Sequence, residues 1–334
     1  MRFFLLLSLL WLATPALAEP MNVIGCGIFD SAGKEQKAYL GWICAFLPNG
    51  KMMIGDGFTL TFYDKDMNVI WARDGHTHHM LTYSAADQTV LVISSRIFGP
   101  QSRLRIDVLE VFDIEGKQLK KFEFTREMSR AFLPMTYDNF VMPTVKMELT
   151  HVGSFYRIGK NRSKSKFFAE GNYLVNDNFG ALYVFNKELT KVIHTFETNG
   201  WNLGMFGDVQ VTPAGNLLLY NNGNPRDPAS RASLVEFDPF TKRVLWRYRG
   251  EAPDFLRGAY EGNVQILSSG NILFSEAVFQ ETVEPHELWQ RSTEITRAGK
   301  KVWQMKKDRY EIYGIPNVVK RLDLSAYRKA KGAY

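Results

Sequence analysis

The sequence predicts an all-β protein, a single-domain β-propeller of five to six four-stranded antiparallel blades. A similar unit of about fifty residues recurs along the chain. Each unit contains several short runs rich in β-branched and aromatic residues, and the clearest share a Gly-Asn turn and a Trp in the last run. Stacking such sheets radially buries their faces and protects their edges. A pair of β-sandwiches would not explain why turn and Trp recur at one period.

The clearest unit runs from Gly207 to Tyr248. Its first two expected strands are joined by the turn Pro213-Ala214-Gly215-Asn216, which is typical of a hairpin. The third strand, 232–238, alternates apolar and polar residues, and the fourth, 243–248, contains Trp246. The next unit, 262–304, repeats this order.

The same template fits three earlier units, at 42–71, 78–122 and 151–185. Clear repeats therefore cover residues 42–304. Residues 21–30 and 310–324 are left over, and strands from the two ends commonly close such a ring, so a sixth blade stays open. The stretch 126–147 fits no repeat, and we interpret it as a lid or an inserted excursion.

The first eighteen residues have the pattern of a cleaved signal peptide. Arg2 precedes an apolar run from Phe3 to Ala13, and Ala16-Leu17-Ala18 supplies the small residues of a cleavage site. The run is too short to span a bilayer. We therefore expect a signal peptide at 1–18, a propeller domain at 19–334, and a periplasmic or secreted protein. A buried N-terminal helix is the less favoured alternative.

The two cysteines, Cys26 and Cys44, are the only ones in the chain. In an exported protein an even pair is more often a disulfide than a metal or redox site. A bridge of this span would add about 3 kcal/mol of stability. Two free buried thiols are one alternative. The other is a lipoprotein acylated on Cys26, which is less favoured because Glu19 and Pro20 separate Val23-Ile24-Gly25-Cys26 from the apolar run.

The charge pattern argues against a nucleic-acid partner. The formal net charge is +6 for 334 residues, and cations gather only at Lys160–Lys166 and near the C-terminus, where we expect solvated loops. Phosphate-binding loops, dinucleotide fingerprints and serine nucleophile elbows are absent from the sequence, so we expect no cofactor. His76, His78 and His79 do not share one face of a strand, so we expect no metal site.

The run Gly207–Tyr220, the segment Asn221-Asn222-Gly223-Asn224-Pro225-Arg226 and the strand Val244-Leu245-Trp246 together resemble the bacterial arylsulfotransferase family. The resemblance is strongest over 42–304. It implies a periplasmic six-bladed propeller that passes a sulfuryl group from one phenol to another. The carrier in that family is a histidine that is transiently sulfated, and no nucleotide donor takes part.

Aligning the units on their turns indicates which residues meet at the axis, because equivalent positions of innermost strands converge there. Two of the aligned positions, His79 and His151, match channel histidines of the family and are the candidate catalytic residues. The candidate ligand-binding residues are Trp42, Asp208, Asn263, Asn222 and Arg226.

Three departures from the family weaken the catalytic interpretation. The sulfated histidine falls on Gly207, an arginine falls near Asn176, and an asparagine falls on Gly153. The sequence therefore favours a binding protein for a small anionic or aromatic molecule, such as a phenol or aryl sulfate, or for an envelope protein. The alternative is sulfuryl transfer through His79 or His151, so whether the protein is an enzyme stays open.

Overall fold

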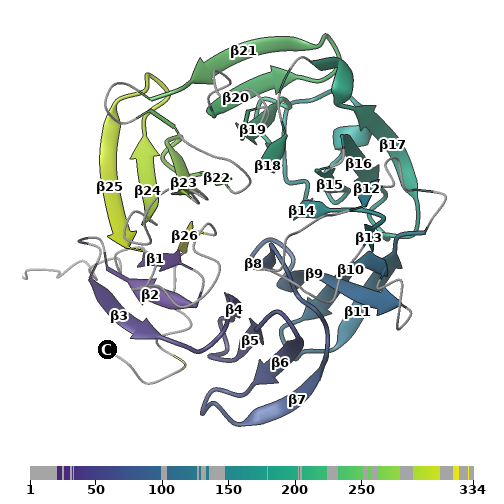
Figure 1. Ribbon diagram of the computed structural model, residues 1–334, viewed down its shortest axis with the longest axis vertical. Coiled ribbons are helices and arrows are strands. Elements are labelled where there is room, and N and C mark those ends of the chain that lie inside the picture. The colour runs from purple at the N-terminus through teal and green to yellow at the C-terminus, as the bar shows by residue number, and fades with distance from the viewer. Residues whose placement is uncertain are drawn as a thin grey trace, which may run out of the picture.

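Six β-sheets surround a central axis like the blades of a propeller (Figure 1). The computed structural model describes residues 21–24, 26–30, 32, 34–98, 104–125, 128, 133–134, 147–178, 180–201, 203, 205–223, 232–250, 255–256, 262–278, 289–308, 319–322 and 330. Five sheets have four strands and one has six. The predicted all-β propeller is thereby confirmed.

Five sheets follow one another along the chain, each beginning with its innermost strand (Figure 1). Blade 1 contains β4 (Ile43–Phe46), β5 (Met52–Gly55), β6 (Thr59–Tyr63) and β7 (Val69–Asp74). Blade 2 contains β8 (Leu81–Ser84), β9 (Thr89–Phe98), β10 (Leu104–Asp113), β11 (Gln118–Glu123), β12 (Leu133–Pro134) and β13 (Met147–Glu148). Blade 3 contains β14 (Val152–Arg157), β15 (Tyr173–Asp177), β16 (Ala181–Phe185) and β17 (Val192–Glu197). Blade 4 contains β18 (Phe206–Val211), β19 (Leu217–Asn221), β20 (Ser233–Asp238) and β21 (Arg243–Tyr248). Blade 5 contains β22 (Gly262–Ile266), β23 (Ile272–Val278), β24 (Trp289–Ile295) and β25 (Lys301–Asp308). Two short 3-10 helices, η2 (Lys166–Phe168) and η3 (Asn199–Trp201), lie in loops.

The sixth blade is built from both ends of the chain. Its order is β26 (Val319–Leu322), β1 (Met21–Ile24), β2 (Gly27–Phe29) and β3 (Glu35–Ala38). Strand β26 pairs antiparallel with β1 and is innermost (Figure 1). The ring therefore has six blades.

The predicted disulfide is confirmed. Cys26, between β1 and β2 of blade 6, is bonded to Cys44 in β4 of blade 1, with Cα atoms 5.1 Å apart. A sulfur in a disulfide cannot also carry a lipid, and the bridge is consistent with an extracytoplasmic location. The predicted signal segment at 1–18 lies outside the described residues. Within the described residues, no helix has the length and apolar character that crossing a membrane requires.

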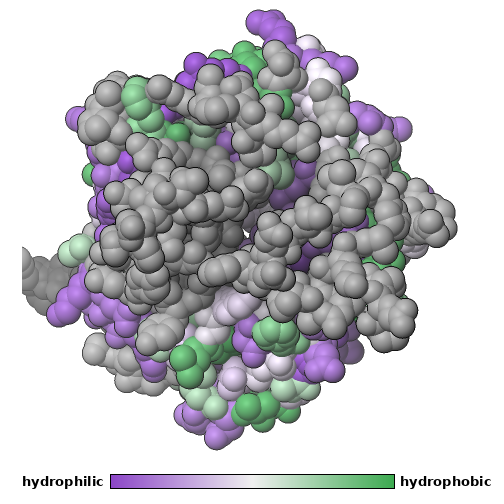
Figure 2. All heavy atoms as spheres, in the orientation of Figure 1, coloured by the Kyte–Doolittle hydropathy of each residue, from purple (hydrophilic) through white to green (hydrophobic). Residues whose placement is uncertain are grey.

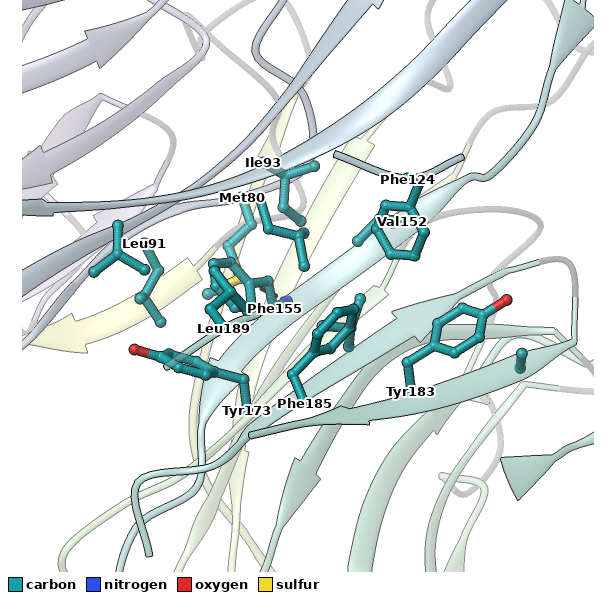
Figure 3. Close-up of a cluster of buried hydrophobic side chains, with 14 residues drawn as sticks. Met80, Leu91, Ile93, Phe124, Val152, Phe155, Tyr173, Tyr183, Phe185 and Leu189 are labelled. Carbon is teal, nitrogen blue, oxygen red and sulfur yellow. Dashed lines mark hydrogen bonds between the residues drawn. The ribbon is translucent and has the colours of Figure 1, made fainter. Parts of the chain in front are cut away.

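Burial follows the position of each strand in its blade. Middle strands such as β19 are buried throughout, because neighbouring blades cover both of their faces. Outermost strands such as β7 and β21 keep many exposed residues, and hydrophilic and hydrophobic residues both reach the rim (Figure 2). Between blades 2 and 3, Met80 and Ile93 pack against Phe155 of β14 and its neighbours (Figure 3).

Polar clamps join successive blades near the axis. The N–H of Val152 donates to Asp107 of the preceding blade at 2.8 Å, and the N–H of Val264 donates to Asp208 at 3.0 Å. Ser154 Oγ accepts from the N–H of Val209 at 3.3 Å. Each clamp satisfies an inner-strand donor with a side chain of the blade before it, so the starts of the innermost strands are held in register.

The stretch 126–147, which matched no repeat, contributes two short strands to blade 2. Strand β12 pairs with β13, and β13 runs parallel to the beginning of β10. In this ladder Arg105 lies beside Glu148. The position of Glu148 just before blade 3 proves important for the candidate site.

Candidate functional site

Two histidines from neighbouring blades meet where the innermost strands begin. Nε2 of His79, just before β8, lies 2.9 Å from Nε2 of His151, just before β14. Both side chains are partly buried, and His79 has a φ of +54°, in the left-handed region. The structure therefore brings together the two histidines that the repeat alignment placed at equivalent positions.

Glu148 binds the Nδ1 side of the His151 ring, whereas Nε2 of the same ring faces His79. One oxygen, Oε2, accepts from Nδ1 of His151 at 2.8 Å, and Oε1 is 2.6 Å from Nη2 of Arg105. Glu148 and Arg105 are both buried. Burial raises the pKa of Glu148, but the charges of His151 and Arg105 outweigh burial and lower it below its ordinary value. Glu148 is therefore a carboxylate, and His151 donates Nδ1–H to it.

Asp107 completes the buried network. Its side chain accepts from the hydroxyl of Thr150 at 3.0 Å and from Nε2–H of His78 at 2.9 Å, in addition to the N–H of Val152. Burial raises its pKa, but His78, Arg105 and the backbone donor lower the pKa to about 2. Burial together with the charge of Arg105 lowers the pKa of His78, so His78 is a neutral donor.

The surroundings of the pair disfavour a charged His79. Burial and the charges of His151, His78 and Arg105 lower the pKa of His79 well below 6.5. Arg105 is flanked by two carboxylates, Asp107 and Glu148. A third buried carboxylate, Asp177, accepts from the N–H of His151 at 3.0 Å.

This arrangement resembles the way proteins prepare a reactive imidazole. A carboxylate on Nδ1 fixes the tautomer and the ring orientation. The His151 side chain is 14% exposed, so solvent can reach it. His79 is the hydrogen-bond partner that a ligand would have to displace or share.

The other predicted site residues have different surroundings. Asp208 accepts from Tyr156 Oη at 3.1 Å as well as from the backbone of Val264, so its contacts join blades 3, 4 and 5. Asn263 Oδ1 accepts from Ser275 Oγ at 2.5 Å. The ring of Trp42 lies against the backbone of Gly57. Arg226 lies outside the described residues.

Asn222 stands out because it is buried while, within the described residues, both polar atoms of its side chain lack a hydrogen-bond partner. In the same described part of the chain, Oδ1 of Asn176 and Nδ1 of His78 are also buried without a partner. All three lie at the strand ends where the histidine pair is found. Each unsatisfied group costs about 1–3 kcal/mol, a cost that bound water or ligand would relieve.

Gly207 cannot be replaced by a side-chain-bearing residue in this packing. A Cβ there would lie 2.3 Å from the carbonyl oxygen of Gly262 and 2.9 Å from its nitrogen. A side chain at position 207 would therefore force β18 and β22 apart. Similarly, a Cβ on Gly153 would lie 2.8 Å from Oδ1 of Asn178. The side chain of Asn178 therefore occupies the space that a larger residue at position 153 would need.

Among the described residues, no group of three or more His, Cys, Asp or Glu side chains is arranged to hold a metal ion. The repeat pattern did not indicate the site roles of Arg105, Asp107, Glu148 and His78. A signal was present in β10, where Arg105 and Asp107 alternate with apolar residues in an otherwise buried strand. Charged residues at such positions indicate a buried polar network.

Comparisons with known proteins support the fold. A scan against protein-family models and a search of curated proteins give no match. A protein of unknown function from Bacteroides caccae superposes with a TM-score of 0.57 at 15% identity, over 90% of this chain and 98% of that one. The WD40 β-propeller domain of Doa1 gives a TM-score of 0.48 at 12% identity, over 86% and 79%. At 15% identity, the likeness to the Bacteroides caccae protein shows the fold alone.

Proposed function

We propose that this propeller binds a small phenol or aryl sulfate at the His79–His151 pair. The observation that carries the proposal is the Nε2–Nε2 contact of 2.9 Å, with Glu148 fixing His151 from behind. The resemblance to arylsulfotransferases supplies the ligand class. Binding is favoured over catalysis because Gly207, at the position of the family's nucleophile, has no room for a side chain.

A phenol and an aryl sulfate require different protonation states of the histidine pair. A phenol can donate its hydroxyl proton to an imidazole lone pair, so it suits the neutral pair. An aryl sulfate needs a cation, and the guanidinium of Arg105 is already engaged by Asp107 and Glu148. The sulfate therefore binds together with a proton, and its affinity rises as the pH falls.

Asn222 and Asn176 supply polar groups for the rest of the ligand. An amide offers two donors and an acceptor, and those of Asn222 have no partner among the residues that the structure describes. A sulfate or phenol oxygen that accepts from Asn222 would remove the cost of burying this amide.

Sulfuryl transfer through His151 is a second candidate, favoured by the Glu148–His151 contact. In this reaction Nε2 of His151 forms a bond to sulfur while the bond from sulfur to the phenol oxygen breaks. The phenolate leaves as an anion, because the lowered pKa of His79 keeps that imidazole neutral. A second phenol then attacks sulfur through its oxygen, and the bond from sulfur to Nε2 of His151 breaks. The proton of this phenol passes to the first phenolate, which restores the starting state.

Calorimetric titration with 4-nitrophenol and 4-nitrophenyl sulfate tests the proposal. We expect His79→Ala and His151→Ala to weaken both ligands at least tenfold, whereas the matched control His194→Ala, on the outermost strand β17, leaves them unchanged. Sulfate binding should tighten between pH 8 and pH 6, while phenol binding should not. Absence of binding by the native chain would overturn the proposal. Turnover with a phenol acceptor that is lost in His151→Ala would favour transfer instead.

A further inference from the structure

A second binding feature lies in the loop between β14 and β15, in the segment Lys160–Lys166. Exposure alternates strictly along it. The part-buried residues are Asn161, Ser163 and Ser165, and the exposed ones are Lys160, Arg162, Lys164 and Lys166. We call these four cations the cationic row.

The inward side chains fix the backbone of the row. Nδ2 of Asn161 donates to the carbonyl of Phe168 at 2.7 Å, and Oδ1 of Asn161 accepts from the N–H of Ser163 at 3.0 Å. Ser163 and Ser165 accept from the N–H groups two residues further on, at 3.1 and 3.3 Å. The N–H of Arg162 donates to Pro213 of blade 4 at 3.0 Å. The row is therefore preorganised, which lowers the entropy lost when a ligand binds.

The charges of the row are not neutralised within the described part of the chain. None of its four side chains forms an ion pair there, and Lys166 lies over the ring of Phe167, 5.5 Å from its centroid. Glu170 is the only carboxylate in the loop from Ile158 to Asn172. Four like charges held in a line repel one another, and a bound anion relieves this repulsion.

The shape of the row favours a linear ligand. Its four cations stand on every second residue and span at most about 20 Å. Beside it lies the ring of Phe240, which is 46% exposed and packs on Phe168 with centroids 5.4 Å apart. A line of cations next to an exposed ring matches a charged chain of sugars better than a flat bilayer. The disulfide is consistent with a location where such polymers occur.

We propose that the cationic row binds an acidic polysaccharide through its carboxylate or sulfate groups, with Phe240 against a sugar ring. Strand β14 runs from Val152 beside the histidine pair to Arg157 beside the loop, so the row is at the opposite end of blade 3. This site is independent of the proposed phenol or aryl sulfate site.

Fluorescence anisotropy with labelled polygalacturonate, at several salt concentrations, tests this on the full exported chain. The test variant is K160Q/R162Q/K164Q/K166Q. The matched control is K34Q/K37Q/K117Q/K300Q, which removes four exposed charges elsewhere. We expect the test variant to lose at least tenfold in affinity and to show a shallower salt dependence, while the control changes less than twofold. His79→Ala should bind polygalacturonate normally.

Three results would overturn the proposal. The first is equal loss in both quadruple variants, which would mean that only net charge matters. The second is tighter binding to a single-stranded oligonucleotide or to anionic phospholipid vesicles than to polygalacturonate. The third is no binding by the native chain at low salt. Unfolding curves of both variants establish that each remains folded.

Discussion

Asp107 is a single buried carboxylate on which two blades and one histidine depend. It accepts from Val152, Thr150 and His78, and its side chain is fully buried. Asp107→Asn removes the charge and presents a donor where three donors converge. We expect a loss of about 3 kcal/mol in the free energy of unfolding. Urea denaturation measures it, and Asp66→Asn, at an exposed turn, should change it by less than about 0.5 kcal/mol. Equal effects of the two variants would refute this role of Asp107.

At the same scale, His78 and His79 make stability depend on pH. Their pKa values lie below the ordinary 6.5 in the folded protein, so the unfolded chain takes up protons first as the pH falls. Their contribution is complete above pH 6.5 and declines below it, by at most about 1.4 kcal/mol per pH unit for each group. Asp107, lowered from 3.8 to about 2, adds stability that is lost only as the pH falls from about 4 through 2. Urea denaturation at pH 8, 6 and 5 should show that the free energy of unfolding declines as the pH falls. The decline should be smaller in His79→Gln. A free energy of unfolding that does not change with pH would contradict the prediction.

At the scale of elements, the contact between β18 and β22 explains why a glycine occupies position 207. Gly207→Ala places a methyl group 2.3 Å from the carbonyl oxygen of Gly262, so the two inner strands must separate. We expect a loss of about 2–3 kcal/mol, typical of overpacking. Gly200→Ala is the control, because a Cβ there meets nothing within 4 Å.

Because position 207 has no space for a side chain, Gly207→His should not create a transferase. A stable, active Gly207→His protein, assayed with 4-nitrophenyl sulfate and phenol, would show that this contact is not restrictive.

The strands were predictable because their signals are local. Hairpin turns such as Pro213-Ala214-Gly215-Asn216 and the alternating residues of β20 mark each blade without reference to the rest of the chain. The repeat alignment also placed His79 and His151 at equivalent positions. It could not supply Glu148, because β13 belongs to a stretch without a repeat and reaches β10 by a parallel pairing. Nor could it show that Asp208 is engaged between blades, since that depends on Tyr156 and Val264 of other blades.

At the scale of the whole molecule, ring closure depends on blade 6, which combines both ends of the chain. Its link to blade 1 through Cys26 and Cys44 restrains the unfolded chain across 18 residues of sequence. Cys26→Ala/Cys44→Ala should therefore lower the free energy of unfolding by about 3 kcal/mol. Because Cys26 is fully buried, reductant alone should act slowly on the folded protein and quickly in urea. Mass spectrometry after alkylation in urea without reductant checks the bridge: no label on either cysteine is expected. Labelling of both cysteines would show that the ring closes without the disulfide. A double variant as stable as the native chain would show that strand pairing between β26 and β1 is enough to close the ring.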